Sequence, residues 1–199
     1  MTNAEPRQDR SRETRVRVLR SAVECLATHG YSATTIALVA EHARVSRGAA
    51  QHHFPTRAAL FTAAVEQVMH EREEQLRKHF VHREPARDTL AIVEGLFDLF
   101  STQVFRAALV LWVAAAAEPS LRDHVAPLEA RIGKEMHQLV VELLGVDESI
   151  PGVRQTVQAT LDLGRGLGLA NLLTDDRRRR ARIAQQWATT LDAVLLHED

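Results

Sequence analysis

The apolar residues of this chain recur at intervals of three and four, and in no run do they alternate strictly with polar residues as in a half-exposed strand. Residues at these intervals share one face of an α-helix, so the spacing limits the chain to helical folds. The first such stripe holds Val16, Leu19, Val23 and Leu26, and it stops at Gly30, a residue type common just after a helix. The sequence therefore predicts an all-α protein of about nine helices.

Capping and breaking residues divide this pattern into separate helices. In the first part we expect a helix over about 10–29, a short one capped by Thr34 or Thr35 that stops near Ala43, one from Ser46 to about His53, and a long one over about 56–80. Further along, Pro127 should kink or restart a helix, and Gly145 should end it. The turn at 174–176 should separate the last two helices, over about 152–174 and 177–196.

The charges are unevenly divided along the chain. Residues 1–60 hold nine arginines and five acidic residues, whereas the remaining residues hold 16 basic and 21 acidic ones. A basic head joined to an acidic body suggests that the head meets a polyanion, with nucleic acid as the leading candidate. No apolar run approaches the ~20 residues of a membrane span, and the polar N-terminus carries no secretion signal, so we expect a cytoplasmic protein. The single Cys25 predicts a buried structural thiol.

The segment from Thr34 to Leu60 predicts two short helices joined by a tight turn, which is the geometry of a helix-turn-helix. The second helix of this motif fits the major groove of DNA, where small residues allow close approach and longer polar ones reach base edges. The expected third helix offers both kinds: Gly48, Ala49 and Ala50, with Arg47, Gln51 and His52. Ser46 and Thr35 can serve phosphates.

The stretch GYSATTIALVAEHARVSRGAAQHHFPTRAAL, from Gly30 to Leu60, resembles the TetR family of bacterial transcriptional regulators. The shared features are a Gly-Tyr before the second helix, paired threonines, a Val-Ser turn, a glycine in the recognition helix, a His-Phe at its end and a basic residue opening the fourth helix. The C-terminal two-thirds match only in length and helical layout. The resemblance implies a helix-turn-helix DNA-binding domain over 10–56 and an effector-binding and dimerisation domain over 57–199. Residues 1–9 are expected to form a disordered arm.

The resemblance also implies roles for individual residues of the head. Phosphate contacts are implied for Thr35, Gln51, His53 and Arg57, and base contacts for Arg47, Ala49 and His52. Two residues depart from the family pattern. Arg44 stands where the turn usually holds a glycine with positive φ, at a cost of roughly 1 kcal/mol that a phosphate contact could offset. Gln51 replaces the usual tyrosine, and its amide could read a base, so the operator sequence is not predicted.

The apolar stripes of the body allow two interpretations. By composition they are ordinary core, whereas the resemblance implies a small-molecule cavity among these helices. The candidates for its lining are Phe97, Phe100, Trp112, Met136 and Val140, with His137 as a polar handle or, equally, an exposed helix residue. The last two helices are implied to form a four-helix dimer interface through Leu161, Gly164, Gly168, Leu172, Ile183, Trp187, Leu191 and Val194. Gly164 and Gly168 could also permit close approach of two helices.

These features together predict a homodimeric DNA-binding regulator. We expect a repressor that leaves a near-palindromic operator when a small effector binds, with the fourth helix joining head to body. An activator, or a DNA-binding protein without an effector, is the alternative. A helical enzyme is disfavoured because no Ser-His-Asp arrangement, HExxH motif, paired ExxH motifs or phosphate loop is present. No cofactor or metal is predicted, since His79 and His82 form only an isolated HxxH. The arginines at 177–180 and 182 predict local ion pairs or a cross-dimer contact.

Overall fold

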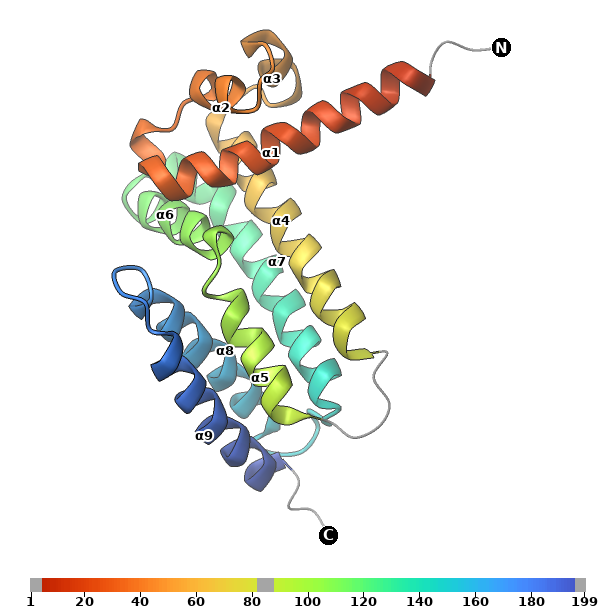
Figure 1. Ribbon diagram of the computed structural model, residues 1–199, viewed down its shortest axis with the longest axis vertical. Coiled ribbons are helices and arrows are strands. Elements are labelled where there is room, and N and C mark those ends of the chain that lie inside the picture. Colours follow the sequence, from red (N-terminus) through yellow and green to blue (C-terminus); the bar gives the residue numbers. More distant parts are fainter. Residues whose placement is uncertain (1–4, 82–87, 196–199) are drawn as a thin grey trace. The chain divides into compact units, whose positions relative to one another are not determined.

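The computed structural model describes residues 5–81 and 88–195, which form nine α-helices and no strand (Figure 1). The expected all-α class is therefore confirmed. The helices are α1 (Glu5–Ala33), α2 (Ile36–His42), α3 (Arg47–His53), α4 (Arg57–Val81), α5 (Thr89–Leu99), α6 (Gln103–Ala117), α7 (Pro119–Leu144), α8 (Val153–Ala170) and α9 (Arg177–Leu195).

The chain folds into two compact units. The first comprises the described residues up to His70 together with Arg106–Ala130, and the second comprises Glu71–Phe105 and the chain from Arg131 onward. The sequence places the division earlier, at 56/57. The first turns of α4 belong with the head because their apolar side chains are buried there, and Phe61 lies edge-on to Tyr31 with ring centroids 5.7 Å apart.

Two glycines act at helix ends as the sequence predicted, whereas the start of the first helix differs from the prediction. Gly30 interrupts the helical backbone of α1 with φ 76°, as predicted, but the helix begins at Glu5 and not near residue 10. Part of the expected disordered arm is therefore helical, and Pro6 lies in the first turn, where a missing N–H costs no helical bond. Gly145, with φ 59°, ends α7 as expected.

Helix α7 continues through Pro127, which the sequence expected to kink or restart the helix. It begins at Pro119, eight residues before Pro127. Pro127 and Asp123, whose carbonyl loses its helical N–H partner, are both exposed, so water can satisfy that carbonyl. A helix can therefore pass through this proline at a reduced cost.

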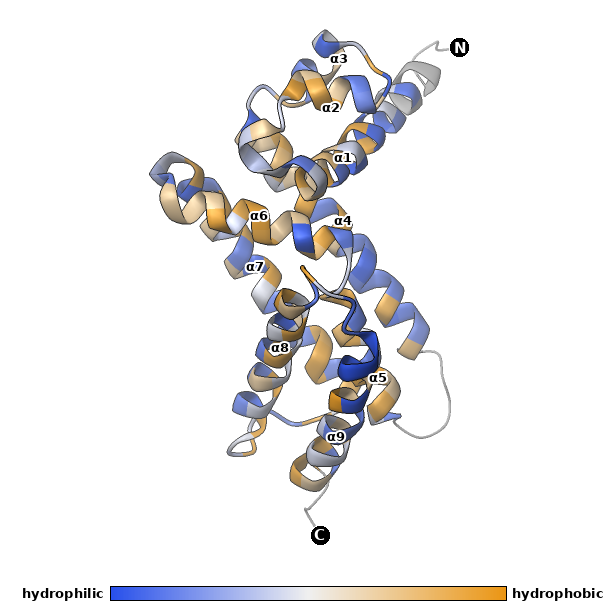
Figure 2. Ribbon diagram, turned by 60° about the vertical axis from the view of Figure 1, so that its left-hand side comes forward, coloured by the Kyte–Doolittle hydropathy of each residue, from blue (hydrophilic) through white to orange (hydrophobic). Residues whose placement is uncertain are grey.

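The second unit is a helical bundle in which α5 packs against both α8 and α9 (Figure 1). The hydroxyl of Thr89 donates to Asp192 at 2.6 Å, and Trp187 Nε1 donates to Thr160 at 3.0 Å. Each helix has hydrophobic and hydrophilic residues, as Figure 2 shows. In the described part of the chain, no single helix is long and apolar enough to cross a membrane, although α5 and α6 pass that test as a bent pair.

Candidate nucleic-acid interface and ligand-binding region

The start of the helix-turn-helix is fixed by two adjacent threonines with different tasks. Thr34 is fully buried, and its hydroxyl lies 3.1 Å from the carbonyl of Cys25 and 2.6 Å from that of Gly30. Thr35 is exposed and caps α2, because its hydroxyl oxygen accepts from the backbone N–H of Leu38 at 3.1 Å. The cap occupies only a lone pair of Thr35, so its O–H remains able to donate to a phosphate.

The turn between α2 and α3 contains the strain that the sequence predicted. Arg44 has φ 54° and is the single non-glycine residue with positive φ in the described chain. Its N–H donates to Glu41 and that of Val45 donates to Ala40, both at 3.0 Å, which is the hydrogen-bond pattern of a Schellman helix end. The turn therefore keeps the geometry usual for glycine, and Arg44 projects from it with an exposed side chain.

Helix α3 is capped and anchored so that one face points outward. Ser46 accepts from the N–H of Ala49 at 3.1 Å, and Ala50 is fully buried. Four residues of the helix are exposed: Arg47, Gly48, Gln51 and His52. Ala49 and His53 are half-buried, because successive helical residues turn by about 100° and carry these two toward the rest of the head. Gln51 and His52 thus lie on either side of Gly48 at the centre of the exposed face.

Gly48 has no role in the fold of the head that would require a glycine. A Cβ atom placed on it would meet no atom within 4 Å, and its φ is not positive. Glycine inside a helix costs about 1 kcal/mol relative to alanine, so the absent side chain is a local disadvantage. A close approach by another molecule to this face explains it best.

His53 stands at the inner edge of the exposed face. Its ring lies 5.7 Å from that of His52 and 6.2 Å from that of Phe54. Burial lowers the pKa of His53, and the nearby His52 and Arg15 lower this pKa further. The imidazole is therefore neutral at pH 7, and it can meet a phosphate only as a neutral hydrogen-bond donor.

Arg57, a predicted phosphate contact, is engaged by its own chain. Its Nη2 donates to the carbonyl of Tyr31, and its guanidinium carbon lies 4.4 Å from the centroid of the Tyr31 ring. The side chain is half-buried and joins the first turn of α4 to the end of α1. A phosphate contact by Arg57 stays a prediction, and the structure adds a positioning role that the sequence did not reveal.

The six residues predicted to line a cavity lie in both units of the chain. Phe97, Phe100, Met136 and Val140 are buried in the second unit, whereas Trp112 belongs to the first. His137 is nearly buried, and its Nε2 bonds to Glu148 in the loop after α7. His137 is therefore not the exposed residue that the sequence allowed, and the lining of a cavity by these residues stays a prediction.

A pocket of about 340 Å³ lies between α4 and α5, and none of the six predicted residues lines it. Its lining follows two helical stripes, each with residues at intervals of three and four, and the members are Arg72, Gln75, Leu76, His79, Gly95, Asp98, Leu99 and Thr102. The spacing on each helix is visible in the sequence. Sequence reasoning missed the pocket because the spacing does not show which two stripes face each other.

Half of the predicted dimer residues lie inside the single chain. Leu161, Gly164, Gly168 and Leu191 are buried, which corrects their assignment to an exposed face. A Cβ on Gly164 would lie 2.5 Å from the ring of Phe100, and one on Gly168 would lie 2.3 Å from the Phe100 carbonyl oxygen. The two glycines therefore allow α8 to approach α5, the second interpretation of the sequence. The other four predicted residues, Leu172, Ile183, Trp187 and Val194, are partly or fully exposed.

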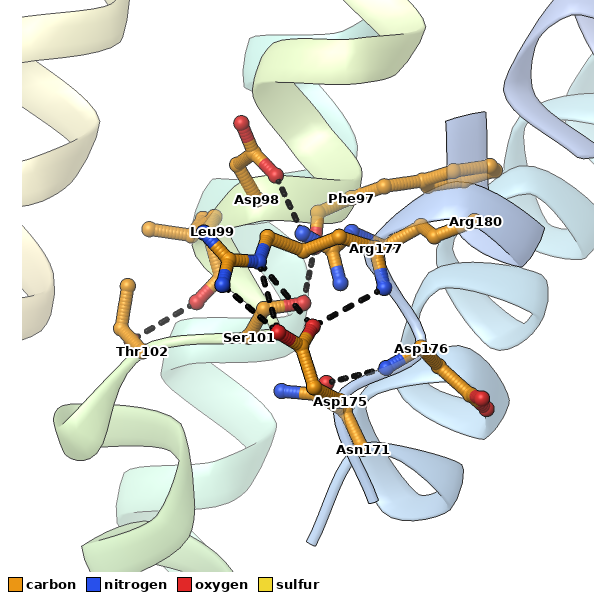
Figure 3. Close-up of polar contacts among 10 residues, drawn as sticks. All are labelled: Phe97, Asp98, Leu99, Ser101, Thr102, Asn171, Asp175, Asp176, Arg177 and Arg180. Atoms are coloured by element: carbon orange, nitrogen blue, oxygen red, sulfur yellow. Dashed lines mark hydrogen bonds and ion pairs between the residues drawn. The ribbon is translucent and has the colours of Figure 1, made fainter. Parts of the chain in front are cut away.

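The arginine run that opens α9, strongly hydrophilic in Figure 2, is largely paired with acidic neighbours. Arg177 bonds both carboxylate oxygens of Asp175, and these bonds lower the pKa of Asp175 to about 2. Arg180 reaches Asp98 of α5 at 2.9 Å (Figure 3). Arg179 pairs with Asp176 at 3.0 Å. The prediction of local ion pairs is confirmed for Arg177 and Arg179, whereas Arg180 pairs with an aspartate that is 82 positions away in the sequence. His82 lies outside the described residues, so its pairing with His79 is not seen.

Comparison with known proteins places this geometry in context. The profile of the "bacterial regulatory proteins, tetR family" matches residues 18–64. The HTH-type transcriptional regulator CymR of Pseudomonas putida is 31% identical over 182 residues, which cover 88% of this chain and 87% of CymR. A transcriptional regulator from Pseudomonas aeruginosa PAO1 superposes with a TM-score of 0.72 at 21% identity, covering 96% of this chain and 93% of that one. NalD, the secondary repressor of the MexAB-OprM multidrug efflux pump in Pseudomonas aeruginosa, superposes with a TM-score of 0.59 at 24% identity, covering 89% of this chain and 96% of NalD.

Proposed function

Because this chain belongs to the TetR family of bacterial transcriptional regulators, we propose that it is a homodimeric repressor. Its first unit binds a near-palindromic DNA operator, and a small molecule bound by the second unit releases it. The observation that carries the proposal is the exposed face of α3, on which Arg47, Gln51 and His52 surround a glycine that the fold does not require. Repression is favoured over activation by the likeness to NalD, which is described as a repressor.

The exposed residues of the head divide into two kinds of DNA contact. Gln51 and His52 flank the point of closest approach and can bond base edges, and Arg47 can pair with a guanine. Thr35 and Arg44 lie before α3, exposed, where they can bond phosphates. This assignment gives Gln51 a base contact, in place of the phosphate contact that the family resemblance implies.

In a dimer, the second subunit would recognise the second half of the operator. Helix α9 carries an apolar stripe that consists of the exposed Val194 and the half-buried Ile183 and Trp187. This stripe is suited to contact a second copy of this chain. A two-fold dimer presents two copies of α3 to successive major grooves, and the operator should mirror that symmetry.

Regulation is assigned to α4, which is one continuous helix with residues in both units, divided between His70 and Glu71. A ligand that prefers one conformation of the second unit can lower DNA affinity by its differential affinity for two states of the protein. A coupling free energy of about 1–3 kcal/mol would be ordinary for such a switch.

The test is selection of binding sites from random duplex DNA by the purified protein at two salt concentrations. We expect a near-palindromic site whose two halves are about one helical turn apart, with affinity that falls as salt rises. A reporter gene placed behind the selected site should be expressed less when the protein is present, and an activator would raise its expression. Recovery of no enriched sequence would contradict operator recognition by α3.

A further inference from the structure

A groove lies between α4 and α5, and its volume can be compared with that of known ligand pockets. At about 340 Å³ it lies at the lower end of the range for ligand pockets. Leu76 of α4 and Leu99 of α5 form its apolar floor, together with Gly95. A Cβ on Gly95 would lie 3.1 Å from Leu76 and 3.2 Å from Phe80, so the two helices touch at this point.

The register of the two helices gives the groove a direction. Helices α4 and α5 run antiparallel, as Figure 1 shows, and Gly95 contacts Leu76 and Phe80. Along the groove, residues nearer the N-terminus of α4 therefore lie beside residues nearer the C-terminus of α5. Arg72 lies toward the Thr102 end of the groove, and His79 lies toward the opposite end.

The polar groups of the rim that remain available are mainly donors. The hydroxyl of Thr102 already donates to the carbonyl of Leu99 at 2.8 Å. The amide oxygen of Gln75 accepts from Arg72 Nη1 at 3.1 Å, which leaves the amide N–H groups of Gln75 and the rest of the Arg72 guanidinium to meet a ligand. A guanidinium held in this way presents a fork that matches a carboxylate.

Asp98 is the acidic residue of the lining, and its charge is offset within the chain. Arg180, from α9, donates to Asp98 Oδ1 at 2.9 Å (Figure 3). The Arg180 side chain is 11% exposed and that of Asp98 is 71% exposed, so a largely buried cation offsets the charge of an exposed carboxylate. Among the groups lining the groove, the cation left without an acidic partner in the described contacts is Arg72.

We propose that this groove binds a small amphipathic anion, such as a medium-chain monocarboxylate. The anionic group bonds to Arg72 and Gln75, and the apolar body lies along Leu76, Leu99 and Gly95. The ligand touches α4 directly, on the part of that helix that lies in the second unit. Its identity as the effector rests on the proposed function, whereas its binding to the groove does not.

The binding test uses three probes with the same apolar chain and different head groups: octanoate, octylammonium and 1-octanol. Isothermal titration calorimetry of the full-length protein should give the tightest binding for octanoate. Arg72→Gln should weaken octanoate binding about tenfold or more, because it removes a charged hydrogen bond. The control is Lys78→Gln, which removes an exposed cation of α4 that pairs with Glu74 and does not line the groove. This variant should bind octanoate as the unaltered protein does.

Several outcomes would overturn the groove assignment: equal binding of the three probes, octanoate binding that Arg72→Gln leaves unchanged, or no octanoate binding below its micelle concentration. Site selection without any probe tests DNA recognition separately. If an operator is recovered and octanoate fails these comparisons, the groove assignment alone is wrong. If no operator is recovered and octanoate binding still depends on Arg72, the groove assignment stands and the proposed function is wrong.

Discussion

At the scale of single residues, Arg44 should have opposite effects on the stability of the fold and on the proposed binding of DNA. Its φ of 54° is unfavourable for a side-chain-bearing residue, so Arg44→Gly should raise the free energy of unfolding by about 0.5–1 kcal/mol. The same change removes the proposed phosphate contact, so DNA affinity should fall and the slope of log affinity against log salt should decrease by about 1. Urea denaturation and anisotropy titrations at several salt concentrations measure the two effects. A slope unchanged by the substitution would show that Arg44 does not meet a phosphate.

His53 gives the head a predictable response to acid. Its pKa is lowered in the folded protein, chiefly by burial, so the unfolded chain binds a proton more readily. The stability that neutral His53 contributes is complete above the unfolded pKa of about 6.5 and is lost as the pH falls through the lower folded pKa. His53→Gln should therefore make the free energy of unfolding less dependent on pH below about 6.5. Denaturation across that range tests this, with His29→Gln at an exposed position of α1 as the control. An equal effect of both substitutions would contradict it.

Sequence could predict the residue-scale features that depend on neighbours along the chain. The cap at Ser46 and the strained turn at Arg44 follow from residues within four positions of each, and both are confirmed. Arg57 differs because its partner, Tyr31, is 26 positions away in the sequence. No local pattern indicates that pairing. Arg57→Ala would therefore disturb the fold as well as any phosphate contact, and Arg44 is the cleaner probe.

At the scale of helices, Gly48 in α3 should show opposite effects on stability and on binding. A Cβ there meets nothing within 4 Å, so Gly48→Ala should raise the free energy of unfolding by up to about 1 kcal/mol. The added methyl group lies at the centre of the exposed face that we propose binds DNA, so operator affinity should fall. The control is Gly133→Ala in α7, also free of contacts within 4 Å, which should raise stability with no loss of affinity. Retained affinity in Gly48→Ala would remove the main argument for close approach at this face.

Two glycines of α8, Gly166 and Gly168, should respond differently to the same substitution. A Cβ on Gly168 would lie 2.3 Å from the backbone oxygen of Phe100, so Gly168→Ala should lower the free energy of unfolding by about 1–3 kcal/mol. Gly166 is exposed with open space around it, so Gly166→Ala should raise that free energy by up to about 1 kcal/mol. Thermal or urea denaturation of both variants would measure the difference. Equal effects would mean that α8 does not pack against α5 this closely.

The spacing of apolar residues predicts that a helix is present. The residues at which it begins and ends depend also on the free energy of lost backbone hydrogen bonds, which that spacing does not reveal. The sequence expected Pro127 to kink or restart a helix, yet α7 begins eight residues earlier and passes through it, because the exposed position lets water replace the lost bond. Likewise, α1 begins at Glu5, since a proline in a first turn sacrifices no hydrogen bond. At Pro127 the exposure decides, and exposure is a property of the folded chain.

At the scale of the whole molecule, sequence reasoning failed where two distant stripes had to be paired. The residues that line the groove show helical spacing on α4 and on α5. The contact between Leu76 and Gly95, however, depends on the register of two antiparallel helices. The division into two units also falls within α4, at His70, because the start of that helix is held by Tyr31 and the head. Neither the pairing of these helices nor the division within α4 can be predicted from the residue spacing of a single segment.

Dimerisation determines whether the exposed face of α3 can recognise an operator tightly. Val194 is 56% exposed and shares a stripe of α9 with Ile183 and Trp187, so Val194→Glu should place a charge in the proposed interface and shift the protein toward monomer. A monomer engages one half-site without the second linked contact, so operator affinity should fall about 100-fold or more. Sedimentation velocity and anisotropy titration measure the two effects.

The matched control is Gln185→Glu, which adds the same charge to an exposed position of α9. Gln185 is two residues from Ile183 and therefore about 200° around the helix, away from the stripe. This variant should remain dimeric and bind the operator almost as the unaltered protein does. If Val194→Glu also stays dimeric, the subunits associate through another surface. If it becomes monomeric and keeps full affinity, one head is sufficient for recognition, and the operator need not be palindromic.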